Sequence, residues 1–427
     1  MKPLFFTLSM LCVVIDAGAS GHPRQRISLN TDWSFVFELP ERADAAGVRT
    51  ATWQGIDLPH SWNVADSTDK TKPYHRGIGR YRKSFFFEPS LDGKKLYLYF
   101  EGANQVADVT VNGRSAGRHV GGYSAFAFDI SDLVRIGKQN EIEVVVDNRH
   151  NDDVPPLNAD FTFYGGIYRD VWLLVLNDVH FDLDDYAATD LRIAPISVSE
   201  KQATVEIDAG VANASGSYRE VSVDSSLVDA DGSVIAEASV STTVEPGDVS
   251  KLRLARFEIE EPNLWSPESP YLYRVICTLR EGSRVLDRLH YPLGLRWIEF
   301  DGETGFRLNG KPYRLFGTNR HQDYPGLGNA LPNEQHRSDL QEIKGNGFNF
   351  LRLAHYPQDP AVLETADEIG LLVWEETPIV NLIGLSAAFR QNSTRMVREM
   401  IRQHRHHPSV IFWGYMNEVT LVEPEPL

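Results

Sequence analysis

Short stretches in which apolar and polar residues alternate fill about the first 300 positions of the chain. Between about residues 27 and 175 they occupy positions 81–85, 96–100, 109–111 and 142–146, and turn residues such as Asn112-Gly113 separate them. Strands at this spacing predict a β-sandwich. We place this first sandwich at residues 27–180.

A second region of the same kind follows, with alternation at positions 203–207 and 272–276. It is about 110 residues long, which suits an immunoglobulin-like sandwich. We place this second sandwich at residues 185–298.

The pattern changes after about residue 300. Apolar segments at 313–317, 349–353, 371–374 and 410–413 predict strands, and the segments between them, 333–344, 360–369 and 386–405, have helical periodicity. Strands that alternate with helices predict parallel βα units. A doubly wound sheet has the same local pattern, but the first turn lacks a GxGxxG phosphate loop. Residues 303–427 therefore fit the first half of a TIM (β/α)8 barrel, a fold that needs about 250 residues.

Composition narrows the class of partner. The chain has 427 residues, of which 42 are basic and 59 acidic, and its formal net charge is −17. Phosphate binding requires clustered cations, so this balance argues against nucleic acid and anionic membranes as partners. We expect a neutral or small partner.

The N-terminal segment predicts export. Lys2 precedes an apolar run at positions 4–14, and small residues follow at Ala17-Gly18-Ala19. This order is typical of a secretory signal peptide, here residues 1–19, and predicts a secreted or periplasmic protein. The run is shorter than the roughly 20 residues that a membrane span requires, so we expect no membrane insertion. After cleavage Cys277 remains as the only cysteine, which excludes an intramolecular disulfide.

Polar residues follow the predicted parallel strands. Asn319, Arg320 and His321 end the first strand, and Arg352 and His355 end the second. The carboxyl ends of barrel strands face one opening, which is where barrel enzymes hold their chemistry. These side chains should therefore lie close together, although a histidine is more often a structural residue than a functional one.

Asn417 and Glu418 follow the fourth strand. Glu418 suits general-acid catalysis if aromatic neighbours such as Trp413 or Tyr415 bury it and raise its pKa. The alternative is a helix-capping glutamate on a solvated loop. Glu375 and Glu376 close the third strand, and there ion pairs with Arg352 or Arg320 are at least as well supported as contact with a substrate.

Two of these segments resemble a known family. Residues 349–357 (NFLRLAHYP), continued through Asp367, Gly370 and Trp374, and residues 410–418 (VIFWGYMNE) resemble the two signatures of glycoside hydrolase family 2, and within it of the β-galactosidases. Leu353 departs from the first signature, and His404 and His406 depart from the start of the second.

The resemblance implies a retaining β-glycosidase that hydrolyses terminal β-galactosides. It also implies that the first sandwich, residues 27–180, is a sugar-binding jelly roll that resembles galactose-binding domains. It implies that Glu418 is the catalytic acid/base and that Asn417 contacts the 2-hydroxyl of the sugar. The other substrate-binding candidates that it implies are His321, His355, Arg352, Asn319 and, from the loop before residues 166–171, Asp160. The alternative is that Asp160 has a structural role as a turn-forming residue.

Retention also requires a second carboxyl about 5–5.5 Å from the first. In the family this nucleophile lies at the end of a later barrel strand, so we expect it beyond Leu427 and expect the 427-residue chain alone to have little or no activity. β-Glucuronidase or β-mannosidase activity stays open, although the triplet Asn319-Arg320-His321 favours a galactosidase over the Asn-Lys-His of glucuronidases. A non-catalytic carbohydrate-binding remnant also stays open.

No cofactor is expected. The sequence has no HExxH or CxxC motif, and the acidic residues 182–185 lack an EF-hand frame. Some relatives use magnesium and sodium near the site, but the residues after Glu376 do not reproduce the magnesium-ligand spacing. The expected partner is a carbohydrate substrate, and a homo-oligomer of the complete enzyme stays open.

Overall fold

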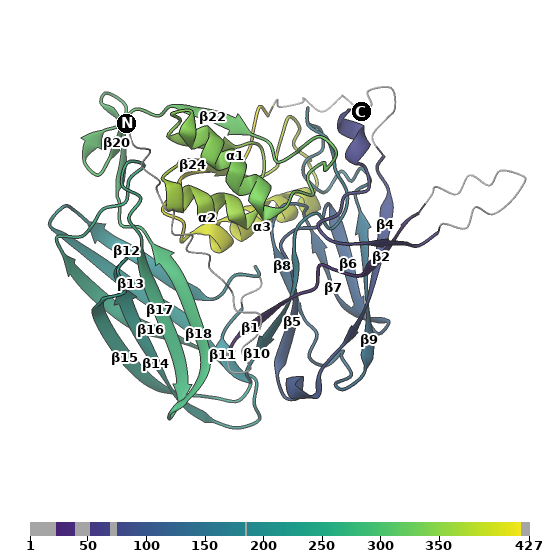
Figure 1. Ribbon diagram of the computed structural model, residues 1–427, viewed down its shortest axis with the longest axis horizontal. Coiled ribbons are helices and arrows are strands. Elements are labelled where there is room, and N and C mark those ends of the chain that lie inside the picture. The colour runs from purple at the N-terminus through teal and green to yellow at the C-terminus, as the bar shows by residue number, and fades with distance from the viewer. Residues whose placement is uncertain (1–22, 39–51, 69–74, 184–185, 420–427) are drawn as a thin grey trace, which may run out of the picture.

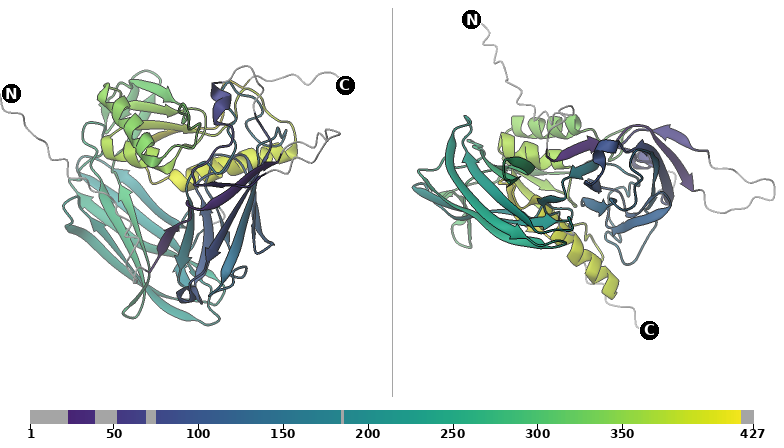
Figure 2. Two further views of the ribbon diagram at one scale, coloured as in Figure 1. Left: turned by 45° about the vertical axis from the view of Figure 1, so that its right-hand side comes forward. Right: turned by 90° about the horizontal axis from the view of Figure 1, so that it is seen from below.

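A computed structural model describes residues 23–38, 52–68, 75–183 and 186–419. The predicted signal peptide and two of the acidic residues at 182–185, Asp184 and Asp185, lie outside these ranges. Two sandwiches lie side by side, and the helical part covers one end of both (Figures 1 and 2). No helix in the described ranges is long and apolar enough to cross a membrane.

The predicted first sandwich is confirmed. A six-stranded antiparallel sheet in the order β3-β2-β4-β9-β6-β7 faces a four-stranded one in the order β1-β10-β5-β8. The strands are β1 (Gln25–Ser28), β2 (Trp33–Glu38), β3 (Gln54–Ile56), β4 (Ile78–Phe86), β5 (Lys95–Phe100), β6 (Val106–Val111), β7 (Arg114–Val120), β8 (Phe126–Asp129), β9 (Gln139–Asp147) and β10 (Val171–Leu176), with short 3₁₀ helices at Val64–Ser67 and Pro89–Leu91.

Alternation explains why this sandwich closes. Leu96, Leu98 and Phe100 of β5 are fully buried while the residues between them are only partly buried, as expected for a strand with one face on a core. Asn112 and Gly113 both have positive φ, 53° and 75°, and join β6 to β7 in the tight hairpin that their sequence predicted.

The second sandwich is confirmed as well. β11 (Val179–Phe181), β12 (Leu191–Val198), β13 (Gln202–Asn213) and β16 (Val249–Glu260) form one sheet, and β14 (Arg219–Val228), β15 (Val234–Val244), β17 (Tyr273–Glu281) and β18 (Arg284–Leu293) form the other. Cys277 is free and buried in the core between the sheets. Burial raises the pKa of this thiol to about 11, so it remains protonated and unreactive at neutral pH.

A small sheet of β19 (Ile298–Asp301), β20 (Gly305–Leu308) and β21 (Lys311–Pro312) leads into the third part. There β22 (Gly317–Arg320), β23 (Phe350–Leu353), β24 (Leu372–Glu376) and β25 (Val410–Gly414) pair in parallel and in chain order. The connections contain α1 (Asn333–Gly345), α2 (Pro360–Ile369) and α3 (Ala387–His404). This is the partial barrel that the sequence predicted.

The first predicted barrel strand was misplaced. The sequence predicted it at 313–317, whereas β22 spans Gly317–Arg320. Side-chain hydrogen bonds hold the preceding segment outside the sheet: the Asn349 carboxamide accepts from the Phe316 N–H at 2.8 Å and donates to the Arg314 carbonyl at 2.9 Å. The apolar run at 313–316 therefore leads to the strand and does not form it.

Arg169 joins the first sandwich to the barrel segment. It is 3% exposed, and one guanidinium nitrogen donates to the carbonyls of Glu101 and Tyr123 in the sandwich. The other nitrogen donates to the Gln322 side chain at 3.3 Å and to the Pro357 carbonyl at 2.7 Å, both in the barrel segment. One buried cation therefore satisfies acceptors on both sides of the junction.

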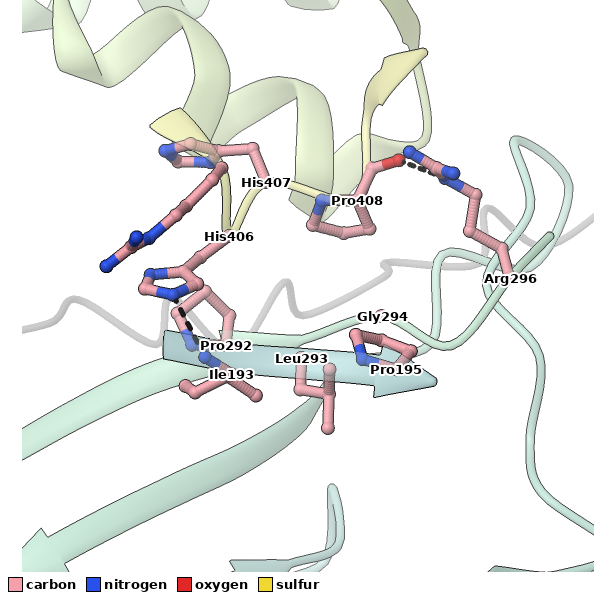
Figure 3. A pocket seen from close by; sticks show the side chains of 10 residues that line it. Ile193, Pro195, Pro292, Leu293, Gly294, Arg296, His406, His407 and Pro408 are labelled. Atoms are coloured by element: carbon pink, nitrogen blue, oxygen red, sulfur yellow. Dashed lines mark hydrogen bonds between the residues drawn. The ribbon is translucent and has the colours of Figure 1, made fainter. Parts of the chain in front are cut away.

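The second sandwich meets the barrel segment around a small cavity of about 220 Å³ (Figure 3). His406 accepts a hydrogen bond from the Ile193 N–H at 3.3 Å, and Arg296 donates to the carbonyls of Pro408 and Val410. Burial lowers the pKa of His406 to about 3, which keeps its ring neutral and able to accept. His406, which departs from the family signature, therefore serves the domain junction.

Candidate active site

Strand register sorts the polar residues of the parallel sheet onto two faces. Asn319, Arg352 and Trp374 are direct partners across β22, β23 and β24 and share one face. Arg320, Leu353 and Glu375 are the next partners and share the other. The second face packs on α1, α2 and α3, whereas the first opens toward the ends of the strands.

Arg352 organises the open face. Its guanidinium forms an ion pair with Glu376 at 2.8 Å and donates to the Asn417 side-chain oxygen at 2.8 Å. The same Glu376 oxygen accepts from the His355 ring at 2.6 Å, and the guanidinium lies 4.6 Å from the centre of the Trp374 ring. Glu376 is 0% exposed, so its charge is held entirely by these partners.

Gly414 leaves room for this arrangement. A Cβ atom at position 414 would lie 2.4 Å from Trp374 Nε1 and 2.7 Å from Glu376 Cβ. Neither distance is tolerable between non-bonded atoms. A glycine at the end of β25 is therefore required for Trp374 and Glu376 to occupy the open face.

The covered face holds its own charges. Glu375 is 0% exposed and accepts from the His404 ring at 2.9 Å. Arg320 is buried against α1, where it forms an ion pair with Asp339 at 2.6 Å. The expectation of ion pairs is thus met for Glu376 with Arg352, while Glu375 pairs with neither predicted arginine because it points to α3.

Aromatic residues connect the first sandwich to the strand ends. The His321 ring lies 3.2 Å from the Tyr356 hydroxyl and 5.4 Å, centre to centre, from the His355 ring. Phe161, from the first sandwich, lies 5.5 Å from His321 and 5.2 Å from Tyr356. The sandwich therefore supplies one wall of the opening.

Asp160 is exposed and precedes Phe161 in that wall. Burial and the neighbouring His355 lower the pKa of His321, while the negative charges of Asp323 and Asp160 oppose that shift. His321 is therefore neutral at neutral pH, when its ring can both donate and accept. The structure thus brings Asp160, His321, His355, Asn319, Arg352 and Asn417 to one opening.

Asn417 and Glu418 complete this opening from β25. The Asn417 N–H donates to the Ile379 carbonyl at 2.8 Å and its carbonyl accepts from the Asn381 N–H at 3.1 Å, so its backbone is fixed. Glu418 has φ of 49°, in the left-handed region that non-glycine residues rarely adopt, and its side chain is exposed. The sequence analysis required partial burial of this carboxyl, and the described residues do not provide it.

The reason lies in the two aromatic neighbours. Trp413 is 38% exposed and Tyr415 is 59% exposed. β25 pairs only with β24 among the described strands, so its other edge has no strand against which these rings could pack.

A metal site is not evident in the described ranges, where no group of three or more histidine, cysteine, aspartate or glutamate side chains is placed to hold an ion. Glu376, the most buried carboxylate on the open face, is already held by Arg352 and His355.

Sequence reasoning missed three residues of the site: Phe161, Tyr356 and Trp374. Phe161 and Tyr356 directly follow predicted site residues, Asp160 and His355, which was a usable signal for them. Trp374 ends the first of the two signature-like segments, but only strand register shows that it shares a face with Arg352.

Comparisons with known proteins match this architecture. Three family models match consecutive parts of the chain: "Glycosyl hydrolases family 2, sugar binding domain" at residues 27–177, "Glycosyl hydrolases family 2" at 186–296, and "Glycosyl hydrolases family 2, TIM barrel domain" at 301–423. Together they cover nearly all of the described residues.

Individual relatives carry two different activity names. The chain is 37% identical to a β-glucuronidase of Bacteroides fragilis over 413 residues, which are 95% of this chain and 58% of the relative. It is 34% identical to a β-galactosidase of Thermoanaerobacter pseudethanolicus over 405 residues, 92% of this chain and 51% of the relative. The solved structure of a Bacteroides uniformis β-glucuronidase matches with a TM-score of 0.87 and 39% identity, over 93% of this chain and 47% of that one. The chain thus spans about half the length of these relatives.

Proposed function

The chain belongs to glycosyl hydrolase family 2, and from this premise we propose that it carries the acid/base side of a retaining β-glycosidase site, with Glu418 as the proton donor. One observation carries the proposal: Glu418 directly follows Asn417, whose side chain is bound by the same Arg352 that holds Glu376 and adjoins His355. Glu418 thus follows directly, along the chain, a residue that the polar network around Arg352 holds in place.

In the first step the Glu418 carboxyl gives its proton to the glycosidic oxygen as the bond from that oxygen to the sugar carbon breaks. A second carboxylate, about 5–5.5 Å away in retaining enzymes, attacks the same carbon from the opposite face. Glu376 is unsuited to that role because it is fully buried and held by Arg352 and His355. We therefore place the nucleophile outside the described residues.

Glu418 must carry its proton at the start of each turnover. A bound substrate that covers Glu418 would supply the burial that a proton donor needs. Once the leaving group has departed, the Glu418 carboxylate can take a proton from the water that releases the sugar.

A neutral sugar such as a β-galactoside is our first choice of substrate. Asp160 and Asp323 act on His321, and Glu376 already neutralises Arg352. These groups suit the hydroxyls of a neutral sugar better than a uronate carboxylate. An arginine at position 320, in place of the lysine of glucuronidases, gives no direct support for a galactosidase. The Arg320 side chain points to α1 and away from the opening.

A β-glucuronide is the second candidate, because the named relatives with the higher identities are β-glucuronidases. This choice requires a cation for the uronate that the described network does not offer. The two candidates therefore differ in one testable property, the charge of the sugar that is accepted.

The test compares aryl β-galactoside, β-glucuronide and β-mannoside as substrates for the natural protein at its full encoded length. Preference for the galactoside by at least about tenfold, or about 1.4 kcal/mol in transition-state binding, supports the first choice. Preference for the glucuronide would overturn the choice of sugar but not the reaction. Hydrolysis of no aryl glycoside would overturn the reaction and favour a non-catalytic carbohydrate-binding protein.

A further inference from the structure

Helix α3 crosses the end of the first sandwich (Figure 2). A second cavity, lined by none of the residues of the active-site opening, lies beside this helix. It measures about 500 Å³ and lies between β7, Tyr186 and the N-terminal half of α3. We name it the α3 groove; its lining residues are Arg118, Val120, Tyr186, Arg390, Gln391, Asn392, Thr394, Arg395 and Arg398.

Positive charge dominates the α3 groove, although the chain as a whole carries −17. Arg395 pairs with Glu399 at 2.7 Å, and Arg118 lies 3.7 Å from Asp108 in a pair that is exposed on both sides. Arg390 and Arg398 have no carboxylate partner within the described ranges: Arg390 donates to the Leu385 carbonyl, and Arg398 to the Tyr186 hydroxyl at 3.5 Å. Two exposed guanidinium groups are thus available to an anion.

The groove is also held in shape by the junction beneath it. Glu399 is 1% exposed and accepts from the His119 ring of β7 at 3.1 Å. Asn392 donates to the Asp153 carbonyl at 2.8 Å, which fixes the N-terminal half of α3 against the first sandwich. Binding here needs no rearrangement of the two domains.

The rest of the lining suits a saccharide. Gln391 and Thr394 are exposed amide and hydroxyl groups that can bond to sugar hydroxyls, and Tyr186 offers an aromatic ring of the kind on which sugar faces pack. Arg390 and Arg398 are eight positions apart on one helix, which places their backbones about 12 Å apart along its axis. An extended chain with repeated acidic groups could contact both.

We propose that the α3 groove is a non-catalytic binding site for an acidic saccharide, whose carboxylate or sulfate groups pair with Arg390 and Arg398. Guanidinium groups bind such oxygens with two parallel hydrogen bonds. The choice of a saccharide among anionic ligands rests on the proposed glycosidase function. The site would hold one part of an acidic polysaccharide on the enzyme while another part of the same polysaccharide enters the active-site opening.

The test is affinity electrophoresis of the full-length protein in native gels that contain polygalacturonate. Arg390→Gln/Arg398→Gln removes the two available cations. Arg114→Gln/Arg284→Gln is the matched control, because it removes two exposed arginines outside the groove and changes the net charge equally. Gels with neutral galactan, and gels with inorganic polyphosphate, separate saccharide recognition from attraction to any polyanion.

We expect the wild type and the control variant to be retarded by polygalacturonate and released by added salt. The groove variant should bind about tenfold more weakly, because two exposed ion pairs are lost. Absence of retardation, or equal retardation of both double variants, would overturn the site. Equal retardation by polyphosphate would overturn the assignment of a saccharide as the ligand.

Binding is measured here without hydrolysis, so the two proposals fail separately. A protein that hydrolyses aryl glycosides but ignores polygalacturonate retains the proposed function and loses the groove. The opposite result retains the groove and removes the catalytic assignment of Glu418.

Discussion

Glu375 and Glu376 are neighbours at the end of β24, and both are 0% exposed, yet they belong to different environments. Glu375 points to the covered face and pairs with His404 of α3, whereas Glu376 points to the open face and pairs with Arg352 and His355. A buried, paired carboxylate is therefore not in itself a sign of function. The face of the strand decides whether it supports the fold or the site.

The largest effect is expected for Glu418, at the active-site opening, and it concerns kcat. Glu418→Gln in the full-length protein should lower kcat on substrates with poor leaving groups by about 10²–10⁴-fold, because general-acid catalysis is lost. Activated aryl glycosides should lose much less, since their leaving groups need no proton. Steady-state kinetics on both substrate types measures this, and an equal loss on both would remove Glu418 from the acid role.

Substitution of the paired neighbours tests the contrast itself. Glu376→Gln should lower kcat/KM by about a hundredfold, because Arg352 and His355 lose a charged hydrogen-bond partner worth about 1.5–3 kcal/mol. Glu375→Gln should leave kcat/KM within about twofold of wild type. If both variants lose activity equally, the division of the sheet into two functional faces is wrong.

Asp160 extends the open face into the first sandwich. We expect Asp160→Ala to lower kcat/KM by about ten- to a hundredfold, the range for removal of a charged hydrogen bond to a sugar hydroxyl. Thermal unfolding should change little because Asp160 is exposed. Wild-type kinetics in this variant would reduce Asp160 to a turn former.

Substitution of Glu375, on the covered face of the sheet, should change the stability of the protein and not its activity. Glu375→Gln should reduce the free energy of unfolding by about 1–3 kcal/mol, because the His404 ring loses its charged partner in a buried site. Urea denaturation measures the change, and Glu220→Gln at an exposed position of β14 in the second sandwich gives a surface reference. An unfolding midpoint equal to that of wild type would contradict the structural role of Glu375.

The smallest effect concerns two adjacent histidines below the sheet. The folded-state pKa of His406 lies at about 3, below its ordinary 6.5, so the unfolded chain binds the proton more readily and stability falls as pH falls from about 6.5 toward 3. The ion pair with Asp367 raises the pKa of His407 despite its burial, so its contribution is full below pH 6.5 and is lost as pH rises through the raised value.

Unfolding midpoints measured between pH 4 and pH 8 test these opposite signs. His406→Gln should reduce the loss of stability toward acid. His407→Gln should cost more stability at pH 5 than at pH 8. Identical pH profiles for the two variants would contradict the assignment of opposite pKa shifts.

Local signals explain what could be predicted from the sequence. The predicted bounds of α2 agree with the structure because Asp359 caps its first turn through the Ala361 N–H, Pro360 begins it, and Gly370 ends it with φ of 76°. Each of these effects acts within a few residues. The alternation in the two sandwiches is equally local.

Effects between distant segments explain what could not be predicted. The displacement of β22 depends on Asn349, and the wall of the site depends on Phe161, which lies 160 positions before His321 in the sequence. The direction of the Arg320 side chain depends on the register of β22 with β23 and on its ion pair with Asp339 of α1. Of the triplet at 319–321, Asn319 and His321 lie at the opening, as the strand-end position predicted, whereas Arg320 points to α1.

Arg169 has a consequence for how the molecule can be divided. Separation of the first sandwich from the barrel segment would leave a nine-tenths buried guanidinium without the Gln322 and Pro357 acceptors, at a cost of the order of 1–3 kcal/mol. Neither piece can therefore be exchanged for that of a relative unless the partner of Arg169 travels with it. A chimaera with a single cut between the two sandwiches would divide Arg169 from Gln322 and Pro357. The first sandwich and the barrel segment should therefore come from the same parent, although the second sandwich lies between them in the sequence.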